Sequence, residues 1–131
     1  MLNKLFKAKK EKTILLVEDD EQLAHTVEIA LATKGYKILR AKGGHEGLTM
    51  ALKHQPLLIL LDIRLPDIDG WWVLKSLKET QTTQNVPVVV LTQLNHMGDV
   101  NTGFNLGAVG YLTKPIDLQR LYKKVEEQIK S

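Results

Sequence analysis

Apolar residues in this chain are grouped in five short segments, which are separated by longer stretches with an apolar residue at every third or fourth position. The short segments are residues 13–17, 37–41, 57–61, 86–91 and 110–113. Their length and composition predict β-strands, and the periodic stretches predict amphipathic α-helices. Strands that alternate with helices favour a parallel sheet with right-handed crossovers and helices on both faces. The pattern therefore predicts one α/β domain without internal repeats.

Each helix predicted between these strands has one apolar face. The helices are expected at about residues 20–34, 44–54, 70–79, 97–106 and 117–130. Asp20 is predicted to cap the first helix, because an aspartate side chain accepts hydrogen bonds from the free N–H groups at a helix start. In the second helix, the helical period predicts that Leu48, Ala51 and Leu52 point inward.

The segment 57–61 consists of five consecutive aliphatic residues and runs directly into Asp62. An apolar run without polar alternation predicts a strand that helices cover on both faces, and therefore a central strand. Open α/β sheets bind ligands at the carboxyl ends of their strands, which is where Asp62 is expected. Asp67 and Asp69 follow in a loop rich in turn formers, and we interpret both as turn residues. Asp62 is therefore the first candidate functional residue.

Polar residues also follow other predicted strands. Glu18 and Asp19 follow the first strand, Thr92 follows the fourth and Lys114 follows the fifth. The carboxyl ends of parallel strands share one edge of a sheet, so these side chains are expected to meet Asp62 there. Two carboxylates about 4 Å apart repel each other by roughly 4 kcal/mol at an effective dielectric constant of about 20. Raised carboxylate pKa values, the Lys114 ammonium or a bound cation must offset this repulsion.

An acidic cluster of oxygen ligands favours a hard cation, and Mg²⁺ commonly binds one or two carboxylates together with water and phosphate oxygens. An aspartate beside Mg²⁺ and a lysine can attack a phosphoryl group and form an aspartyl phosphate. Asp62 is the candidate nucleophile. Lys114 can neutralise phosphoryl charge, and Thr92 can donate a hydrogen bond to a phosphoryl oxygen.

In order and spacing, four motifs resemble those of the receiver domains of two-component response regulators: LLVEDD, LLDIRLPDIDG, VVVLT and GYLTKP. The resemblance covers residues 13–130. It implies a flavodoxin-like, doubly wound α/β/α fold with five parallel strands in the order 2-1-3-4-5 and five helices. It further implies that Asp62 accepts a phosphoryl group from a histidine kinase or a phosphotransfer protein and signals to a downstream output protein or domain. Beyond self-catalysed phosphorylation and dephosphorylation, it implies no enzyme activity.

The same resemblance implies a set of metal ligands. Asp19 and Asp62 are expected to bind Mg²⁺ directly, together with the backbone carbonyl of Arg64. Glu18 is expected to contribute mainly through water.

The resemblance also implies roles in phosphoryl binding and switching. Thr92 and Lys114 are expected to contact the phosphoryl oxygens, and the Lys114–Pro115 bond is expected to be cis. Tyr111 matches the aromatic switch position, whose side chain turns inward when Thr92 moves toward the phosphoryl group. The predicted output surface consists of the last two helices and the last strand, which would change when phosphorylation adds charge at the site.

Gln93 departs from the family pattern, because the family usually has alanine or serine directly after Thr92. The longer side chain could crowd the phosphoryl site or slow the attack of water, and Arg64 and Leu94 could also gate access. Gln93 likewise supports an alternative function, a protein-interaction module on the same fold that signals without phosphate. A second alternative, an FMN-binding electron carrier, lacks a phosphate-binding loop after the first strand, where the acidic residues 18–20 would repel phosphate.

The positive charge of the chain is concentrated at its beginning. Five lysines and one glutamate give residues 1–12 a charge of +4, which leaves −1 for the rest of a chain with net charge +3. We therefore predict a basic, disordered tail at residues 1–12 that does not contact membranes, and a receiver domain at residues 13–131. The domain shows no clustered basic residues of the kind that bind nucleic acid. The lack of cysteines, of a secretory signal and of a membrane-spanning run favours a cytoplasmic protein.

Overall fold

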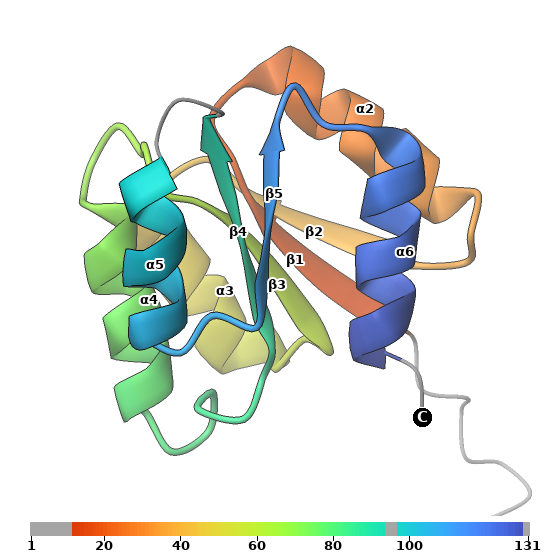
Figure 1. Cartoon of the computed structure of the whole chain (residues 1–131). Helices are drawn as coiled ribbons and strands as arrows, with labels where there is room; N and C mark the ends of the chain where they lie inside the picture. Colours follow the sequence, from red (N-terminus) through yellow and green to blue (C-terminus); the bar gives the residue numbers. More distant parts are fainter. Residues whose placement is uncertain (1–11, 94–96, 130–131) are drawn as a thin grey trace, which may run out of the picture.

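A sheet of five parallel strands runs through the computed structural model, which describes residues 12–93 and 97–129 (Figure 1). The strands are β1 (Thr13–Val17), β2 (Lys37–Ala41), β3 (Leu58–Asp62), β4 (Val88–Gln93) and β5 (Gly110–Lys114). Their order is β2-β1-β3-β4-β5, as predicted. The strand order reverses between β1 and β3, and in open α/β sheets ligands bind at such a reversal, beyond the carboxyl ends of the strands.

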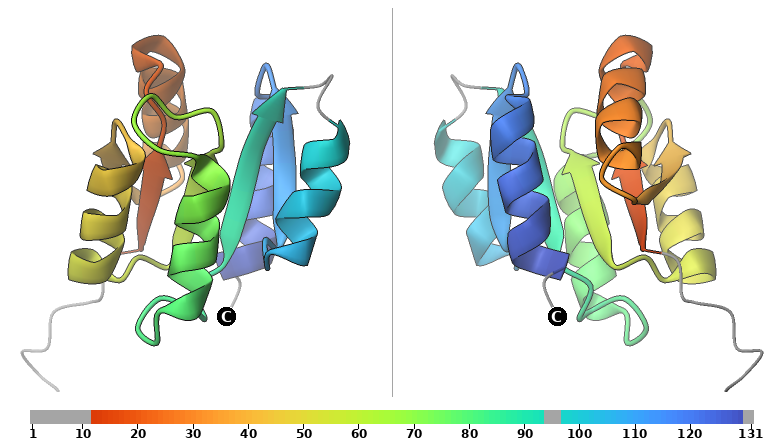
Figure 2. Two further views of the ribbon diagram at one scale, coloured as in Figure 1. Left: turned by 90° about the vertical axis from the view of Figure 1, so that its left-hand side faces the viewer. Right: turned by 90° about the vertical axis from the view of Figure 1, so that its right-hand side faces the viewer.

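Five helices in the described part of the chain cover this sheet. They are α2 (Glu21–Ala32), α3 (Gly44–His54), α4 (Gly70–Glu79), α5 (Met97–Asn105) and α6 (Leu118–Ile129). Helices α3, α4 and α5 lie on one face and helices α2 and α6 on the other, as the two opposite views in Figure 2 show. The prediction of a three-layer α/β/α fold is therefore confirmed.

Strand β3 supplies side chains to the cores on both sides of the sheet. Ile59 and Leu61 pack in the core beneath α3 and α4, and Leu58 and Leu60 pack in the core beneath α2 and α6. All four side chains are 0 % exposed. Full burial of one such side chain stabilises a fold by roughly 1.5–3 kcal/mol. The run has no polar residue because both faces of β3 are buried. The same burial fixes the position of Asp62 at the end of the strand.

Leu52 is 48 % exposed, so the prediction that it points inward is wrong. The buried residues of α3 are Gly44, Gly47 and Ala51, at helical spacing. Leu52 is rotated by about 100° around the helix axis from Ala51, which takes it off the buried stripe. The glycines allow close approach to the sheet: a Cβ at Gly47 would lie 2.9 Å from Val17 Cγ2. The helix therefore contacts β1 through its small residues, and Leu52 lies outside that contact.

Strand β4 begins later than predicted, at Val88 instead of Val86. The Val86 N–H donates to the Thr83 carbonyl at 3.0 Å within the preceding turn, and Pro87 has no N–H to donate. Val88 is therefore the first residue of this segment whose N–H is left for the sheet, although the Pro87 carbonyl already accepts a hydrogen bond from Ile59 N at 3.0 Å. At its other end β4 extends to Gln93, so that Thr92 is part of the strand itself.

Asp67 does more than form a turn. Its carboxylate reaches across to the start of α3 and accepts hydrogen bonds from Gly44 N at 2.8 Å and His45 N at 3.1 Å. These N–H donors lower the pKa of Asp67 to about 2. Asp69, which was also interpreted as a turn residue, is the N-cap of α4 and accepts a hydrogen bond from Trp71 N at 2.9 Å. The loop after Asp62 is thus fixed to the starts of two helices.

Some sequence predictions concern residues outside the described ranges. They include Leu94 and the tail at residues 1–12, of which the structure describes only Lys12. No helix within residues 12–93 and 97–129 has the length and apolar character needed to cross a membrane.

Candidate functional site

The polar residues at four strand ends lie along one edge of the sheet. Asp62 is the last residue of β3, Lys114 is the last residue of β5, and Glu18 follows β1 directly. Thr92 lies near the end of β4, where Asp62 pairs with Leu91 and Lys114 pairs with Gln93 in the strand register. Parallel pairing therefore brings together side chains that are almost a hundred positions apart in the chain, from Glu18 to Lys114.

Glu18, Asp19 and Asp62 form an acidic cluster. One carboxylate oxygen from each residue lies within 4.8 Å of the other two. Glu18 is 1 % exposed and Asp62 is 2 % exposed, whereas Asp19 is exposed to solvent. Charges that are removed from water in this way require a compensating charge nearby.

Lys114 supplies that compensation. Its Nζ lies 2.8 Å from Glu18 Oε1 and 3.2 Å from Asp62 Oδ2. Burial opposes the charged form of Lys114, but the contacts with Glu18 and Asp62 outweigh it and raise the pKa of the ammonium. Burial raises the pKa of the Glu18 carboxyl to about 7; Lys114 acts against this shift, and the Asp62 charge adds to it. One lysine therefore compensates the acidic cluster only in part.

The remaining oxygens of the two buried acids have backbone partners. Asp62 Oδ1 accepts a hydrogen bond from Arg64 N at 3.0 Å, and Glu18 Oε2 accepts one from Asp20 N at 3.1 Å. Asp20 also caps α2 through its side chain, as predicted. Glu18 Oε1 accepts no well-directed hydrogen bond from any described residue, although the Lys114 ammonium is close.

The donor set of this cluster fits a magnesium ion. Three carboxylates are close enough to share one cation, and hard oxygen ligands are those that Mg²⁺ prefers. One buried oxygen of Glu18 still lacks a well-directed partner, and burial disfavours the ionised form of that carboxyl. A divalent cation would relieve both features, because it stabilises the ionised carboxylates that coordinate it.

The other predicted site residues lie around this cluster. Thr92 is 2 % exposed, and its Oγ1 donates a long hydrogen bond of 3.4 Å to the Gln93 carbonyl. Gln93 and Arg64 are exposed. The Lys114–Pro115 peptide bond is cis.

Tyr111 is 36 % exposed, and its ring meets the ring of Phe104 edge to face with 6.1 Å between the ring centroids. Phe104 itself is 47 % exposed. Both rings thus lie at the surface of the β5 and α5 region.

A model of the response regulator receiver domain matches residues 14–126 of this chain. The chain belongs to the response regulator receiver family. The fold, with five parallel strands in the order 2-1-3-4-5, agrees with that assignment.

Receivers of known sequence or structure resemble this one over most of its length. The DNA-binding dual master transcriptional regulator RpaA of Synechocystis is 38 % identical over 112 residues, which cover 86 % of this chain and 46 % of RpaA. A putative response regulator from Chloroflexus aurantiacus superimposes with a TM-score of 0.88 at 33 % identity, covering 93 % of this chain and 100 % of the other. The receiver domain of the sensor histidine kinase PA1611 from Pseudomonas aeruginosa, solved with magnesium coordinated in its active site cleft, gives a TM-score of 0.85 at 28 % identity, with coverage of 93 % and 100 %. The chain thus spans less than half the length of RpaA.

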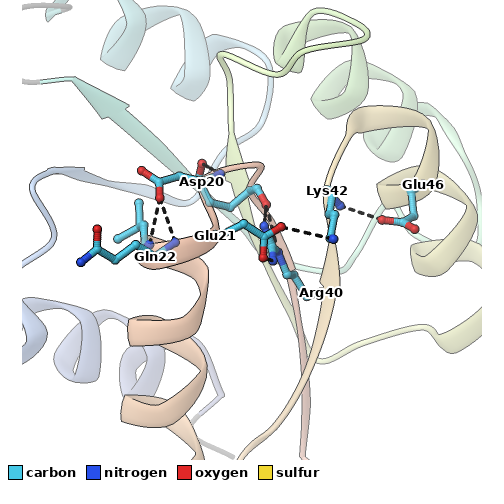
Figure 3. A network of polar contacts seen from close by, with 8 residues as sticks. Asp20, Glu21, Gln22, Arg40, Lys42 and Glu46 are labelled. Atoms are coloured by element: carbon cyan, nitrogen blue, oxygen red, sulfur yellow. Dashed lines mark hydrogen bonds and ion pairs between the residues drawn. The ribbon is translucent and has the colours of Figure 1, made fainter.

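Arg40 contacts the backbone of the acidic cluster, and the sequence alone did not single it out. It lies on the edge strand β2 (Figure 3). Its guanidinium donates two hydrogen bonds to the backbone carbonyl of Glu18. The only signal in the sequence is a long basic residue within a strand of mixed polarity. Nothing in that pattern points to a particular acceptor, because the acceptor is a backbone atom on another strand.

Proposed function

We propose that this receiver is a phosphoacceptor of a two-component signalling system and that Asp62 takes up the phosphoryl group. One observation carries the proposal: Asp62 is a buried carboxylate 3.2 Å from the Lys114 ammonium and adjacent to two further carboxylates. Family membership supports a histidine kinase or a phosphotransfer protein as the donor and an output protein or domain as the recipient of the signal. We place this activity in the cytoplasm.

In the proposed reaction an Asp62 oxygen attacks the phosphorus atom of a phosphohistidine. The P–N bond breaks, its electron pair stays on the imidazole nitrogen, and that nitrogen takes up a proton from solvent. The product is an acyl phosphate on Asp62. Lys114 lies close enough to Asp62 to pair with the new phosphoryl charge, and the Thr92 hydroxyl can donate a hydrogen bond to a phosphoryl oxygen. The protein acts as an acceptor with self-catalysed phosphorylation and dephosphorylation, not as a metabolic enzyme.

Asp19 and Asp62 would hold Mg²⁺ together with the backbone carbonyl of Arg64, and Glu18 would assist mainly through water. When bound, the ion supplies positive charge that offsets the charge on the phosphoryl oxygens. The residues of the chain supply the nucleophile, the hydroxyl donor and the lysine. The proposal is tested by intact-mass measurement after incubation with acetyl phosphate and Mg²⁺: one phosphoryl adduct is expected, and EDTA is expected to prevent it. A protein that signals without phosphate would show no adduct under either condition.

The pKa of Glu18 predicts how magnesium binding depends on pH. Binding requires the ionised carboxylate, so the apparent Mg²⁺ affinity is expected to rise about tenfold from pH 6 to pH 8 and to level off above the pKa of about 7. The stability of the metal-free protein is expected to change with pH in the opposite direction. The contribution of Glu18 to the free energy of unfolding is fully present below its unfolded pKa of 4.5 and is lost as the pH rises through about 7. Isothermal titration calorimetry at several pH values measures the affinity. Glu18→Gln is expected to bind Mg²⁺ more weakly but without this pH dependence, and an equally steep dependence in that variant would contradict the assignment.

Gln93 is expected to prolong the life of the phosphorylated state. Asp62 is only 2 % exposed, so the access of water to an acyl phosphate there depends on the side chains around it. Gln93 pairs with Lys114 in the register of β4 and β5 and is exposed at that edge. In Gln93→Ala the acyl phosphate is expected to hydrolyse several-fold faster, which intact mass followed over time would measure. A lifetime equal to that of the wild type would dispose of this role.

We also propose that phosphorylation repositions Thr92 and Tyr111 and thereby alters the surface formed by α5, β5 and α6. The Thr92 hydroxyl donates a long hydrogen bond of 3.4 Å to the Gln93 carbonyl, and the Tyr111 side chain is 36 % exposed. A phosphoryl group on Asp62 would attract the hydroxyl and make room for the tyrosine ring. Beryllofluoride is expected to shift the amide resonances of residues 97–111 in NMR spectra. Unchanged resonances there, with shifts confined to residues next to Asp62, would argue against the switch.

A further inference from the structure

Arg40 connects the edge of the sheet to the acidic cluster. Its Nε lies 3.2 Å and its Nη2 3.0 Å from the carbonyl oxygen of Glu18, so that two N–H groups converge on one acceptor. The side chain is 14 % exposed. This arrangement is a partly buried contact in which two N–H groups hold the backbone of a residue of the proposed metal site.

Both backbone polar groups of Glu18 form hydrogen bonds with residues of strand β2. Its N–H donates to the Ala41 carbonyl at 3.0 Å, and its own carbonyl accepts from Arg40. The Glu18 carbonyl and the Asp19 N–H belong to one planar peptide unit, so fixing the carbonyl also fixes the direction in which Asp19 leaves the strand. Asp19 is the exposed member of the acidic cluster, and no hydrogen bond of its side chain to a described residue is found.

The guanidinium is also anchored from its outer side. Nη1 of Arg40 forms an ion pair with Glu21 Oε2 at 2.8 Å, and Glu21 Oε1 pairs in turn with Lys42 Nζ at 3.2 Å (Figure 3). The backbone N–H of Lys42 donates to Glu46 Oε1 at 2.7 Å. These contacts join the end of β2 to the starts of α2 and α3. They keep the two N–H groups of Arg40 that bond Glu18, referred to below as its fork, directed at the Glu18 carbonyl.

A simpler interpretation is that Arg40 merely forms a surface ion pair with Glu21. Glu21 is 68 % exposed, and ion pairs at such positions contribute little. The two bonds to the Glu18 carbonyl are the part of the contact that is shielded from water. A planar guanidinium can make both of them, whereas a lysine ammonium cannot reproduce this fork.

We propose that Arg40 is a positioning residue for the Glu18–Asp19 pair, and that it sets the magnesium affinity of the site by fixing the peptide between these two acids. The inference rests on the proposed function, because it concerns the same metal site. It concerns a residue that contacts neither the ion nor the phosphoryl group.

The test compares Arg40→Gln with Lys42→Gln by calorimetric titration of the metal-free protein with Mg²⁺. Both variants lose one positive charge from the same end of β2, and both lose a partner of Glu21. By electrostatics alone, either loss would tighten the binding of a cation. Arg40→Gln is instead expected to bind Mg²⁺ about tenfold more weakly, as is typical when a group that orients a metal ligand is removed. Lys42→Gln is expected to bind as tightly as the wild type or slightly more tightly.

A second variant and a second readout keep the test decisive. A lysine at position 40 can keep one hydrogen bond to the Glu18 carbonyl but not both, so Arg40→Lys is expected to have an Mg²⁺ affinity between those of the wild type and Arg40→Gln. In the metal-free state, the amide of Glu18 is expected to exchange with solvent faster in both Arg40 variants than in Lys42→Gln. Wild-type affinity in both Arg40 variants would overturn the positioning role while leaving the phosphoacceptor proposal intact. If the wild type itself neither binds Mg²⁺ nor accepts a phosphoryl group, the proposed function fails, and this inference fails with it.

Discussion

No phosphoryl adduct is expected on the Asp62→Ala variant after incubation with acetyl phosphate and Mg²⁺, whereas the wild type is expected to gain the mass of one phosphoryl group. The reason is that Asp62 is the acidic residue at the end of the central strand, where its carboxylate lies 3.2 Å from the Lys114 ammonium. Asp19 is exposed to solvent, and the carboxylates paired with Lys114 are those of Glu18 and Asp62. The pKa of Glu18 is raised to about 7, which reduces the ionised fraction of that competing nucleophile. The expected effect is therefore complete loss, not a reduced rate.

Asp69→Asn is a matched control for this experiment. It also removes one carboxylate from the loop region after β3, but asparagine remains a good N-cap and Asp69 lies outside the acidic cluster. This variant is expected to be phosphorylated like the wild type. An adduct that persists in Asp62→Ala would show that another residue accepts the phosphoryl group and would refute the assignment of Asp62.

Replacement of Lys114 by methionine is expected to lower the free energy of unfolding of the metal-free protein by about 3–5 kcal/mol at pH 8, because it leaves two buried carboxylates without their cation. The loss is expected to shrink as the pH falls: Lys114 lowers the pKa of Glu18, so without it the carboxyl becomes protonated at a higher pH and then needs no partner. Urea denaturation followed by tryptophan fluorescence measures both effects. Magnesium is expected to restore part of the lost stability, because it binds the folded state.

Lys75→Met removes an exposed lysine of α4 and serves as the control. Its unfolding free energy is expected to match that of the wild type at each pH. Phosphorylation of Lys114→Met at saturating Mg²⁺ is expected to be strongly slowed, since the phosphoryl charge loses its lysine partner. An unfolding free energy that is equally low at pH 5 and pH 8 would mean that the loss comes from packing and not from the uncompensated acids.

Much of the fold follows from local properties of the chain. The apolar run before Asp62 predicted the central strand, because a strand buried on both faces has no polar alternation. The aspartate at position 20 predicted a helix cap, since its side chain bonds the N–H groups two and three residues further on. Such features depend on spacing along the chain, which the sequence displays directly.

Other features depend on which elements become neighbours. Leu52 has an apolar side chain, yet it is exposed because α3 packs against β1 through the face that carries Gly47 and Ala51, which leaves the leucine outside the contact. Asp67 belongs to a turn in the sequence but caps a helix that begins more than twenty residues earlier. The sequence pattern assigns both residues from their neighbours in the chain. Their positions in the structure depend instead on contacts with segments that are remote in the chain.

The sequence by itself determined that four strand ends would present acids, a hydroxyl and an amine on one edge of a parallel sheet, because strand direction and helix crossovers follow from periodicity. Only the tertiary structure decided how those groups are compensated: a single ammonium lies between Glu18 and Asp62, and Arg40 holds the Glu18 carbonyl from the neighbouring strand. The physical reason is that burial and hydrogen-bond direction depend on atoms that come together from different strands. The spacing of residues along one strand therefore cannot predict either property.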